Sequence, residues 1–172
     1  MRLVAGEPVQ TIVVVVAIGM LITIAYGDVR TRRIPNALAA AIAILGLSRM
    51  ILADDPVATG HTLVASAAVF AVTFLLFWRG VFGGGDAKLI STTVMLVGFH
   101  DLFDFFLLMS LCGGALALAI LTRDRFRLHR RRHISQGTTE AGCSGPPMTP
   151  TVPYGVAIAG AGIVILILRP VL

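Results

Sequence analysis

Six long runs of apolar residues constrain the fold of this chain more than any other feature. They lie at residues 9–26, 36–53, 57–78, 87–99, 102–121 and 152–168. A helix that crosses a bilayer needs roughly 20 mostly apolar residues. The composition agrees, because 56% of the 172 residues are hydrophobic and only 13% are charged, against about 25% charged in a typical soluble domain. The sequence therefore predicts an all-α polytopic membrane protein with about six transmembrane helices, in which residues 1–172 form a single membrane-embedded domain.

The basic residues are sorted by loop, and this sets an orientation. If the chain alternates across the membrane and the loop after the first span is cytoplasmic, eleven basic residues fall inside and three outside. The inner set is Arg30, Arg32, Arg33, Arg79, Lys88, Arg123, Arg125, Arg127, Arg130, Arg131 and Arg132, and the outer set is Arg2, Arg49 and Arg169. This positive-inside bias predicts that both termini lie outside. It also accounts for the net charge of +5, so we expect membrane lipid as a partner and no nucleic acid.

The longest polar stretch, residues 123–150, is rich in Arg, Gly, Ser, Thr and Pro and almost free of apolar residues. Such a composition cannot bury enough apolar surface to offset the entropy of ordering the chain. We therefore predict a flexible basic cytoplasmic loop within the membrane-embedded domain.

Two aspartates lie where a predicted span meets a cytoplasmic loop. Asp28 follows the first span, and Asp86 precedes the fourth. A carboxylate near the hydrocarbon region is energetically expensive, so each is a candidate functional residue. The orientation was derived from arginines and lysine alone, yet it places both acids on the same face of the membrane. The sequence therefore predicts a paired acid site.

The residues around the two acids suggest how such a site is shaped. Gly83, Gly84 and Gly85 precede Asp86, and glycine allows close backbone approach and positive φ angles. Pro35 suits the first turn of the next helix and Asn36 is a frequent capping residue. Lys88 is either a membrane anchor or a site residue.

The fourth span is short, at roughly 20 Å for a core roughly 30 Å thick. Either Asp86 lies below the interface in a thinned or water-filled region, which we favour, or the helix continues past His100.

Two neighbouring carboxyl groups permit one particular chemistry. Like charges raise one pKa, so the pair shares a proton near neutral pH. The ionised partner can draw a proton from water while the protonated partner donates to a peptide carbonyl oxygen. This is aspartyl protease chemistry, which needs no metal or other cofactor. Because the pair titrates as a unit, we assign acid and base roles to neither residue.

These residues resemble those of the type IV prepilin leader peptidases, a family of membrane aspartyl proteases with a Gly-x-Gly-Asp motif. The first motif runs from Asp28 through Arg30 to Ile34-Pro35-Asn36, and the second is Gly83-Gly84-Gly85-Asp86-Ala87-Lys88. A third similarity, Pro153-Tyr154-Gly155, lies at the start of the last span and either closes one side of the site or packs helices together.

The resemblance is greatest to the short peptidases of tight-adherence (Flp) pilus systems, and it implies Asp28 and Asp86 as the catalytic pair. It also implies a single peptidase domain that removes a short basic leader from prepilins and pilin-like proteins. Such an enzyme would act at the cytoplasmic face of the bacterial inner membrane, in pilus biogenesis and protein secretion, with pilus-assembly machinery as a possible partner. The resemblance also implies that longer members of the family carry paired cysteines that bind zinc, and that these members N-methylate the new pilin terminus. The two cysteines of this sequence, Cys112 and Cys143, form no Cys-x-x-Cys motif, so we expect cleavage without that N-methyltransferase module.

Two other classes of function stay open. In a small transporter or proton relay, buried aspartates would bind a cation or pass protons. In a non-catalytic pilus-assembly subunit, the aspartates would pair with arginines, Asp86 with Arg79 and Asp28 with Arg30 or Arg32.

Overall fold

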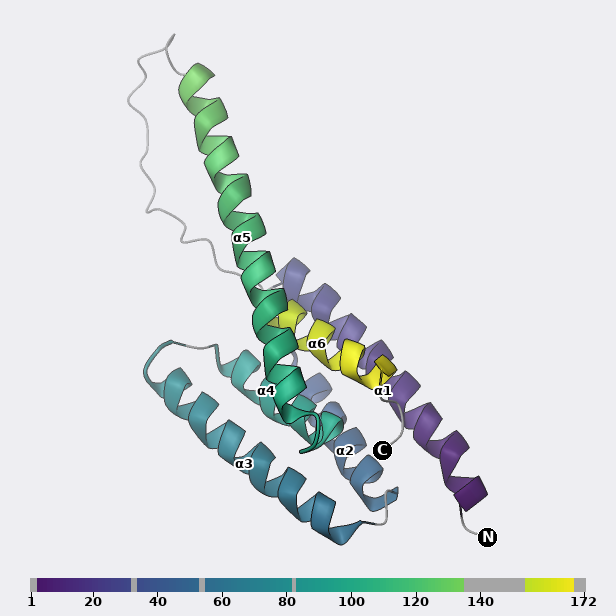
Figure 1. Ribbon diagram of the computed structural model, residues 1–172. Coiled ribbons are helices and arrows are strands. Elements are labelled where there is room, and N and C mark those ends of the chain that lie inside the picture. The colour runs from purple at the N-terminus through teal and green to yellow at the C-terminus, as the bar shows by residue number, and fades with distance from the viewer. Residues whose placement is uncertain (1–2, 32–33, 53–54, 82, 135–153, 169–172) are drawn as a thin grey trace.

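The fold consists of helices throughout the described part of the chain. The computed structural model describes residues 3–31, 34–52, 55–81, 83–134 and 154–168. Its helices are α1 (Leu3–Thr31), α2 (Asn36–Leu52), α3 (Pro56–Trp78), α4 (Gly84–Val97), α5 (Leu102–Ile134) and α6 (Tyr154–Leu168) (Figure 1). The predicted all-α fold is confirmed.

Local signals in the sequence set several of the helix ends. The side chain of Asp55 caps α3 by accepting hydrogen bonds from the backbone N–H groups of Val57 and Ala58, and Pro56 occupies the first turn. Helix α4 ends at Gly98, whose φ of 97° lies in the left-handed region that favours glycine. Of the two explanations for the short fourth span, continuation past His100 was therefore wrong.

The predicted number of long spans needs correction. Among the described residues, three helical segments are long and apolar enough to cross a membrane by length and composition, namely Pro8–Thr31, Pro56–Trp78 and Leu102–Arg123. Asn36–Leu52 and Tyr154–Leu168 are apolar but shorter, and α4 has 14 residues. The prediction of about six full spans was too high because it counted apolar runs without requiring each to match the bilayer thickness.

The boundary of the predicted flexible loop was also wrong. Helix α5 continues without interruption through Arg123 to Ile134 (Figure 1). Arginine and leucine have good helix propensity, and no glycine or proline occurs between Arg123 and Gly137, so a polar composition does not stop the helix there. The rest of the predicted loop, residues 135–150, lies outside the described residues.

Helix α4 is the centre of the bundle. It packs against α2, α3 and α6, and less extensively against α5, whereas α1 packs mainly against α6 and α2. Figure 1 shows α6 running beside α1, and α5 extending beyond the other helices. The apolar core joins α1, α4 and α6, and it includes Leu21, Leu89, Ile90, Val94 and Ile158, all at most 1% exposed.

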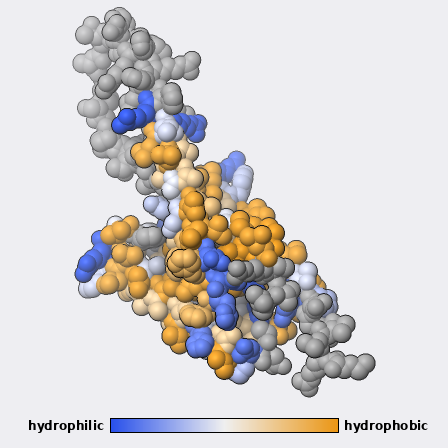
Figure 2. Space-filling model, in the orientation of Figure 1, coloured by the Kyte–Doolittle hydropathy of each residue, from blue (hydrophilic) through white to orange (hydrophobic). Residues whose placement is uncertain are grey.

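The outward-facing surface is strongly apolar, and one interior contact is polar. Large side chains such as Val64, Trp78 and Phe103 are more than two thirds exposed, and hydrophobic residues cover much of the visible described surface in Figure 2. By contrast, the buried residues of α3 are Thr62, Ser66 and Thr73. An apolar exterior with small polar residues between helices is the arrangement expected of helices packed in lipid.

Candidate functional site

Asp28 lies near the end of α1 and is almost completely buried. Its side chain is 6% exposed, and its Oδ2 atom is buried without a hydrogen-bond partner among the described residues. Buried carboxylate oxygens are rarely left in this state, because the lost hydration is not replaced. Packing alone therefore does not explain a carboxyl group at this position of the described structure.

Asp86 lies close to Asp28, in the first turn of α4 and outside the three long apolar spans. Asp86 is half-buried. Burial, and secondly the negative charge of Asp28, raise the pKa of the Asp86 carboxyl from its usual 3.8 to about 6. The fold thus brings together two carboxyl groups that are far apart in the sequence, and the charge of Asp28 acts on Asp86.

Each of the three glycines before Asp86 is in close contact with a different side chain. A Cβ atom at Gly83 would lie 3.0 Å from Asp86 Oδ2, one at Gly84 would lie 3.1 Å from the Phe77 ring, and one at Gly85 would lie 3.3 Å from Ile34 Cβ. The positive φ angles expected here do not occur, since among the described glycines only Gly80 and Gly98 have them. Small size, rather than backbone freedom, is what the structure uses at these positions.

The start of α6 forms another wall of the site. Gly155 is buried, and a Cβ atom there would lie 2.7 Å from Asp28 Oδ2. Tyr154, the first residue of the helix, is 46% exposed and lies near Gly113 of α5. The third predicted motif therefore reaches the acid pair through Gly155, while Pro153 lies outside the described residues.

Lys88 and Asn36 connect the start of α4 to the start of α2. The Lys88 Nζ atom donates a hydrogen bond to Asn36 Oδ1 at 3.1 Å. Pro35 precedes α2, and its carbonyl oxygen accepts from the backbone N–H groups of Leu38 and Ala39. Asn36 thus anchors a lysine at the edge of the site, and its side chain is not used in the capping role that the sequence suggested.

The described arginines do not neutralise the two acids. Arg30 lies over the Tyr26 ring, 5.7 Å from its centroid, and donates to the Tyr26 hydroxyl at 3.0 Å. Among the described residues, Arg79 and Asp86 form no ion pair, and Arg79 does not contribute to the pKa shift of Asp86. Arg32 lies outside the described residues. This arrangement does not favour the scaffold hypothesis, in which arginines hold the aspartates.

The opposite end of the bundle contains polar residues that the sequence did not link. Arg49 of α2 donates to the Leu96 carbonyl oxygen at the end of α4 and is attracted electrostatically by Asp101, which is 4% exposed. No sequence signal connects these residues, because they come from three different helix ends.

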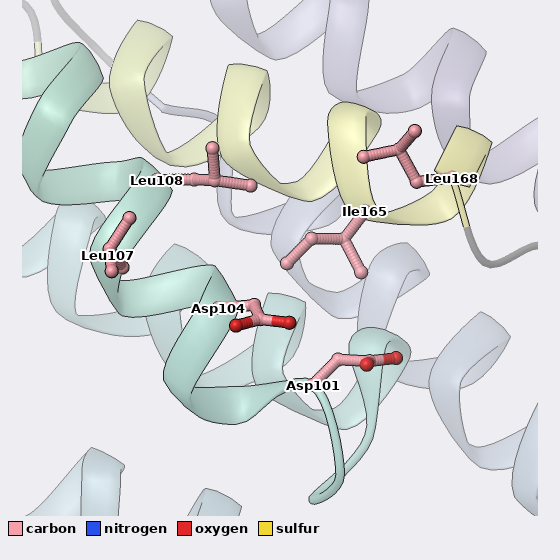
Figure 3. Close-up of a pocket in the computed structure, with 6 residues that line it drawn as sticks. All are labelled: Asp101, Asp104, Leu107, Leu108, Ile165 and Leu168. Carbon is pink, nitrogen blue, oxygen red and sulfur yellow. The ribbon is translucent and has the colours of Figure 1, made fainter.

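A cavity of about 240 Å³ lies beside Asp101 at that end. It is lined by Asp101, Asp104, Leu107, Leu108, Ile165 and Leu168 (Figure 3). Because Asp86 begins α4 and Asp101 follows its end, this cavity is separated from the acid pair by the length of α4. It is not part of the candidate site.

No group of three or more His, Cys, Asp and Glu side chains in the described residues could hold a metal ion. The candidate site is instead a pair of neighbouring carboxyl groups, one buried and one half-buried, within a bundle of apolar helices. These features define a multi-pass α-helical membrane protein with a paired-acid site.

Comparison with known proteins identifies the family of this chain. Residues 15–118 match the type IV leader peptidase family, and this chain belongs to that family. The matched segment contains Asp28 and Asp86 but ends before Tyr154 and Gly155.

The chain is also similar to the prepilin peptidase EppA of Methanothermobacter thermautotrophicus, at 30% identity over 79 residues. That alignment covers 44% of this chain and 20% of the relative. No solved structure matches the chain significantly.

Proposed function

We propose that this protein is a membrane aspartyl endopeptidase that removes the short basic leader of prepilins and pilin-like proteins, using Asp28, Asp86 and a water molecule. The observation that carries the proposal is the convergence of two carboxyl groups from distant parts of the sequence, of which Asp28 is almost completely buried and Asp86 has a pKa raised by burial and, secondly, by the charge of Asp28. Family membership and the name of the relative support the reaction type and the substrate class.

The pair of carboxyl groups supplies both proton transfers that peptide hydrolysis needs. The ionised member takes a proton from water, and the oxygen of that water attacks the carbonyl carbon of the scissile bond. The protonated member donates to the carbonyl oxygen, so that the tetrahedral intermediate forms without a full negative charge. Return of a proton to the leaving nitrogen then breaks the C–N bond and releases the leader.

The other residues of the site would hold this arrangement in place. Gly83 leaves room for the Asp86 carboxyl group, and Gly84 and Gly85 let Phe77 and Ile34 pack closely against the first turn of α4. The hydrogen bond from Lys88 to Asn36 fixes the start of α4 relative to α2. The proposed activity of this site is leader cleavage without N-methylation, as the resemblance to the short peptidases implies.

The location of the proposed reaction follows from the charge distribution. Arginine-rich loops favour the cytoplasmic side, and the end of α1 and the start of α4 lie at the end of the bundle that carries them. We therefore propose a multi-pass protein of the inner membrane, with the site facing the cytoplasm and both termini outside.

The first test is cleavage of a co-expressed prepilin, read as a mobility shift on a gel. Asp28→Asn and Asp86→Asn should each abolish the shift at unchanged abundance in the membrane, because an amide can neither accept nor donate the required proton. Asp55→Asn is the matched control. Asp55 caps α3 and asparagine caps helices equally well, so this variant should cleave like wild type. Cleavage at the wild-type rate by either of the first two variants would reject the proposal and favour a transporter or an assembly subunit.

A further inference from the structure

The first turn of α6 lies directly on the Asp28 carboxyl group. An ideal Cβ atom built at Gly155 would be 2.7 Å from Asp28 Oδ2, 2.8 Å from Cγ and 3.1 Å from Cβ. Real Cβ atoms essentially never approach other atoms this closely. The whole Asp28 side chain therefore occupies space that any residue other than glycine at position 155 would claim.

Space is the reason for glycine here, since the backbone does not demand it. Among the described glycines, only Gly80 and Gly98 have positive φ, so the conformation of Gly155 is open to any residue. Two other glycines of the same helix make the contrast. A Cβ atom at Gly160 would meet nothing within 4 Å, and one at Gly162 would meet Thr93 and Leu21, far from the acid pair.

This contact also has an electrostatic consequence. The first backbone N–H groups of a helix lack partners within the helix, and the helix dipole makes that end positive. Asp28 Oδ2 is buried there without a hydrogen-bond partner among the described residues. The positive end of α6 therefore lies against one of the two carboxyl groups, and close packing rather than a hydrogen bond to Oδ2 brings them together.

We propose that Gly155 is a positioning residue of the acid pair: its missing side chain lets the N-terminal turn of α6 hold the Asp28 carboxyl group in the orientation that faces Asp86. This inference rests on the proposed function of the pair. Gly155 acts through Asp28, which is the group that would contact the substrate.

The catalytic test compares three single glycine variants with wild type in purified form. The substrate is a labelled peptide that spans the leader and cleavage site of a prepilin. Gly155→Ala should lower kcat at least tenfold and leave KM within twofold, because the substrate still binds while the carboxyl group is displaced. Gly160→Ala should match wild type. Gly162→Ala should lower the melting temperature but keep kcat within twofold, which separates positioning from general packing.

A second measurement tests the contact independently of cleavage. Alanine normally stabilises a helix relative to glycine, so a lower melting temperature for Gly155→Ala would itself indicate the clash. Asp28→Ala removes the two closest atoms, and the drop caused by Gly155→Ala should be at least halved in that background. If Gly155→Ala alone does not accumulate in the membrane, recovery of folded protein in the double variant gives the same answer.

The outcomes separate this inference from the function on which it rests. Equal melting-temperature drops in both backgrounds, or wild-type kcat in Gly155→Ala, would overturn the role of Gly155 even if Asp28 proves essential. Conversely, cleavage by Asp28→Asn would reject the proposed function. A smaller melting-temperature drop for Gly155→Ala in the Asp28→Ala background would still establish the contact between Gly155 and Asp28.

Discussion

The ionised form of Asp86 is disfavoured by two separate features of its surroundings. Burial removes part of its hydration, and Asp28 adds a second negative charge nearby. The folded protein therefore holds the Asp86 proton more tightly than the unfolded chain does. A carboxyl group in this position reduces stability once it ionises, which is typical of residues kept for chemistry rather than for packing.

The sign of the pH dependence follows from this shift. Between about pH 4 and pH 6, the folded state binds more protons than the unfolded state, so the wild-type protein loses stability as the pH rises through that window. The loss levels off about one pH unit above the folded-state pKa, once the Asp86 carboxyl group is fully ionised. Asparagine at this position is neutral at every pH, so the comparison with Asp86→Asn isolates the contribution of this one group.

We therefore expect the melting temperature of Asp86→Asn, relative to wild type, to rise from about pH 4, most steeply up to pH 6, and to level off near about pH 7. At pH 4 the wild-type carboxyl group is itself neutral, which makes that point the internal control. Thermal unfolding of both proteins in the same detergent over pH 4 to 8 is the measurement. A difference that stays constant across the range would contradict the shift of the Asp86 pKa.

At the scale of elements, α4 organises the bundle despite its short length. Eight of its 14 residues are buried, and it packs against α2, α3, α5 and α6. Its contact with α2 depends on Gly46, where an ideal Cβ atom would lie 3.0 Å from Met95 Cβ and within 3.2 Å of the backbone around Leu96. A backbone cannot rotate away as a side chain can, so a side chain at position 46 would push α2 and α4 apart. A shift of α4 as a rigid helix would also displace Asp86 at its other end.

Gly46→Ala should consequently lower the stability of the protein, by about 1–3 kcal/mol if overpacking at this site resembles overpacking in other cores. Gly60→Ala in α3 is the matched control, because nothing lies within 4 Å of its Cβ position and alanine is the better helix former. Its stability should equal or slightly exceed that of wild type. Melting temperatures in detergent measure both effects, and equal stability of the two variants would show that α2 and α4 are less closely packed than described.

At the scale of the whole molecule, the two ends of the bundle differ in chemical character. One end gathers the acid pair, the glycines before Asp86 and the start of α6, and α5 continues beyond the apolar bundle with the sequence Arg123–Ile134. The other end holds Arg49, Asp101 and the cavity between α5 and α6. The charge distribution predicts that the first of these ends faces the cytoplasm.

Accessibility of single cysteines to a membrane-impermeant maleimide tests this orientation. In a background of Cys112→Ala and Cys143→Ser, Val57→Cys at the exposed start of α3 should react in intact spheroplasts. Arg125→Cys, which is also exposed, should react only after the membrane is permeabilised. The reverse pattern would place the acid pair on the outer side and would exclude cleavage of a cytoplasmic leader.

The sequence by itself determined the helical fold and the identity of the two acids. Long apolar runs specify helices in lipid because every backbone polar group must be paired within the segment. Asp28 and Asp86 stood out because a carboxyl group at the edge of such a run is costly, whatever its neighbours are. The sequence overestimated the number of long spans and ended α5 too early, since hydropathy alone fixes neither the minimum length of a span nor the point where a polar helix stops.

Only the tertiary structure decided which residues meet. Helices that are apolar all round give no sequence signal for their rotation or relative height, because lipid accepts any of their faces. For this reason neither the contact of Gly155 with Asp28 nor the attraction of Arg49 to Asp101 could be read from spacing along the chain. The first depends on how the start of α6 packs against the end of α1, and the second on how the end of α2 lies beside the segment between α4 and α5. Small residues such as Gly155 and Gly46 permit this close packing, and their effect is visible only in three dimensions.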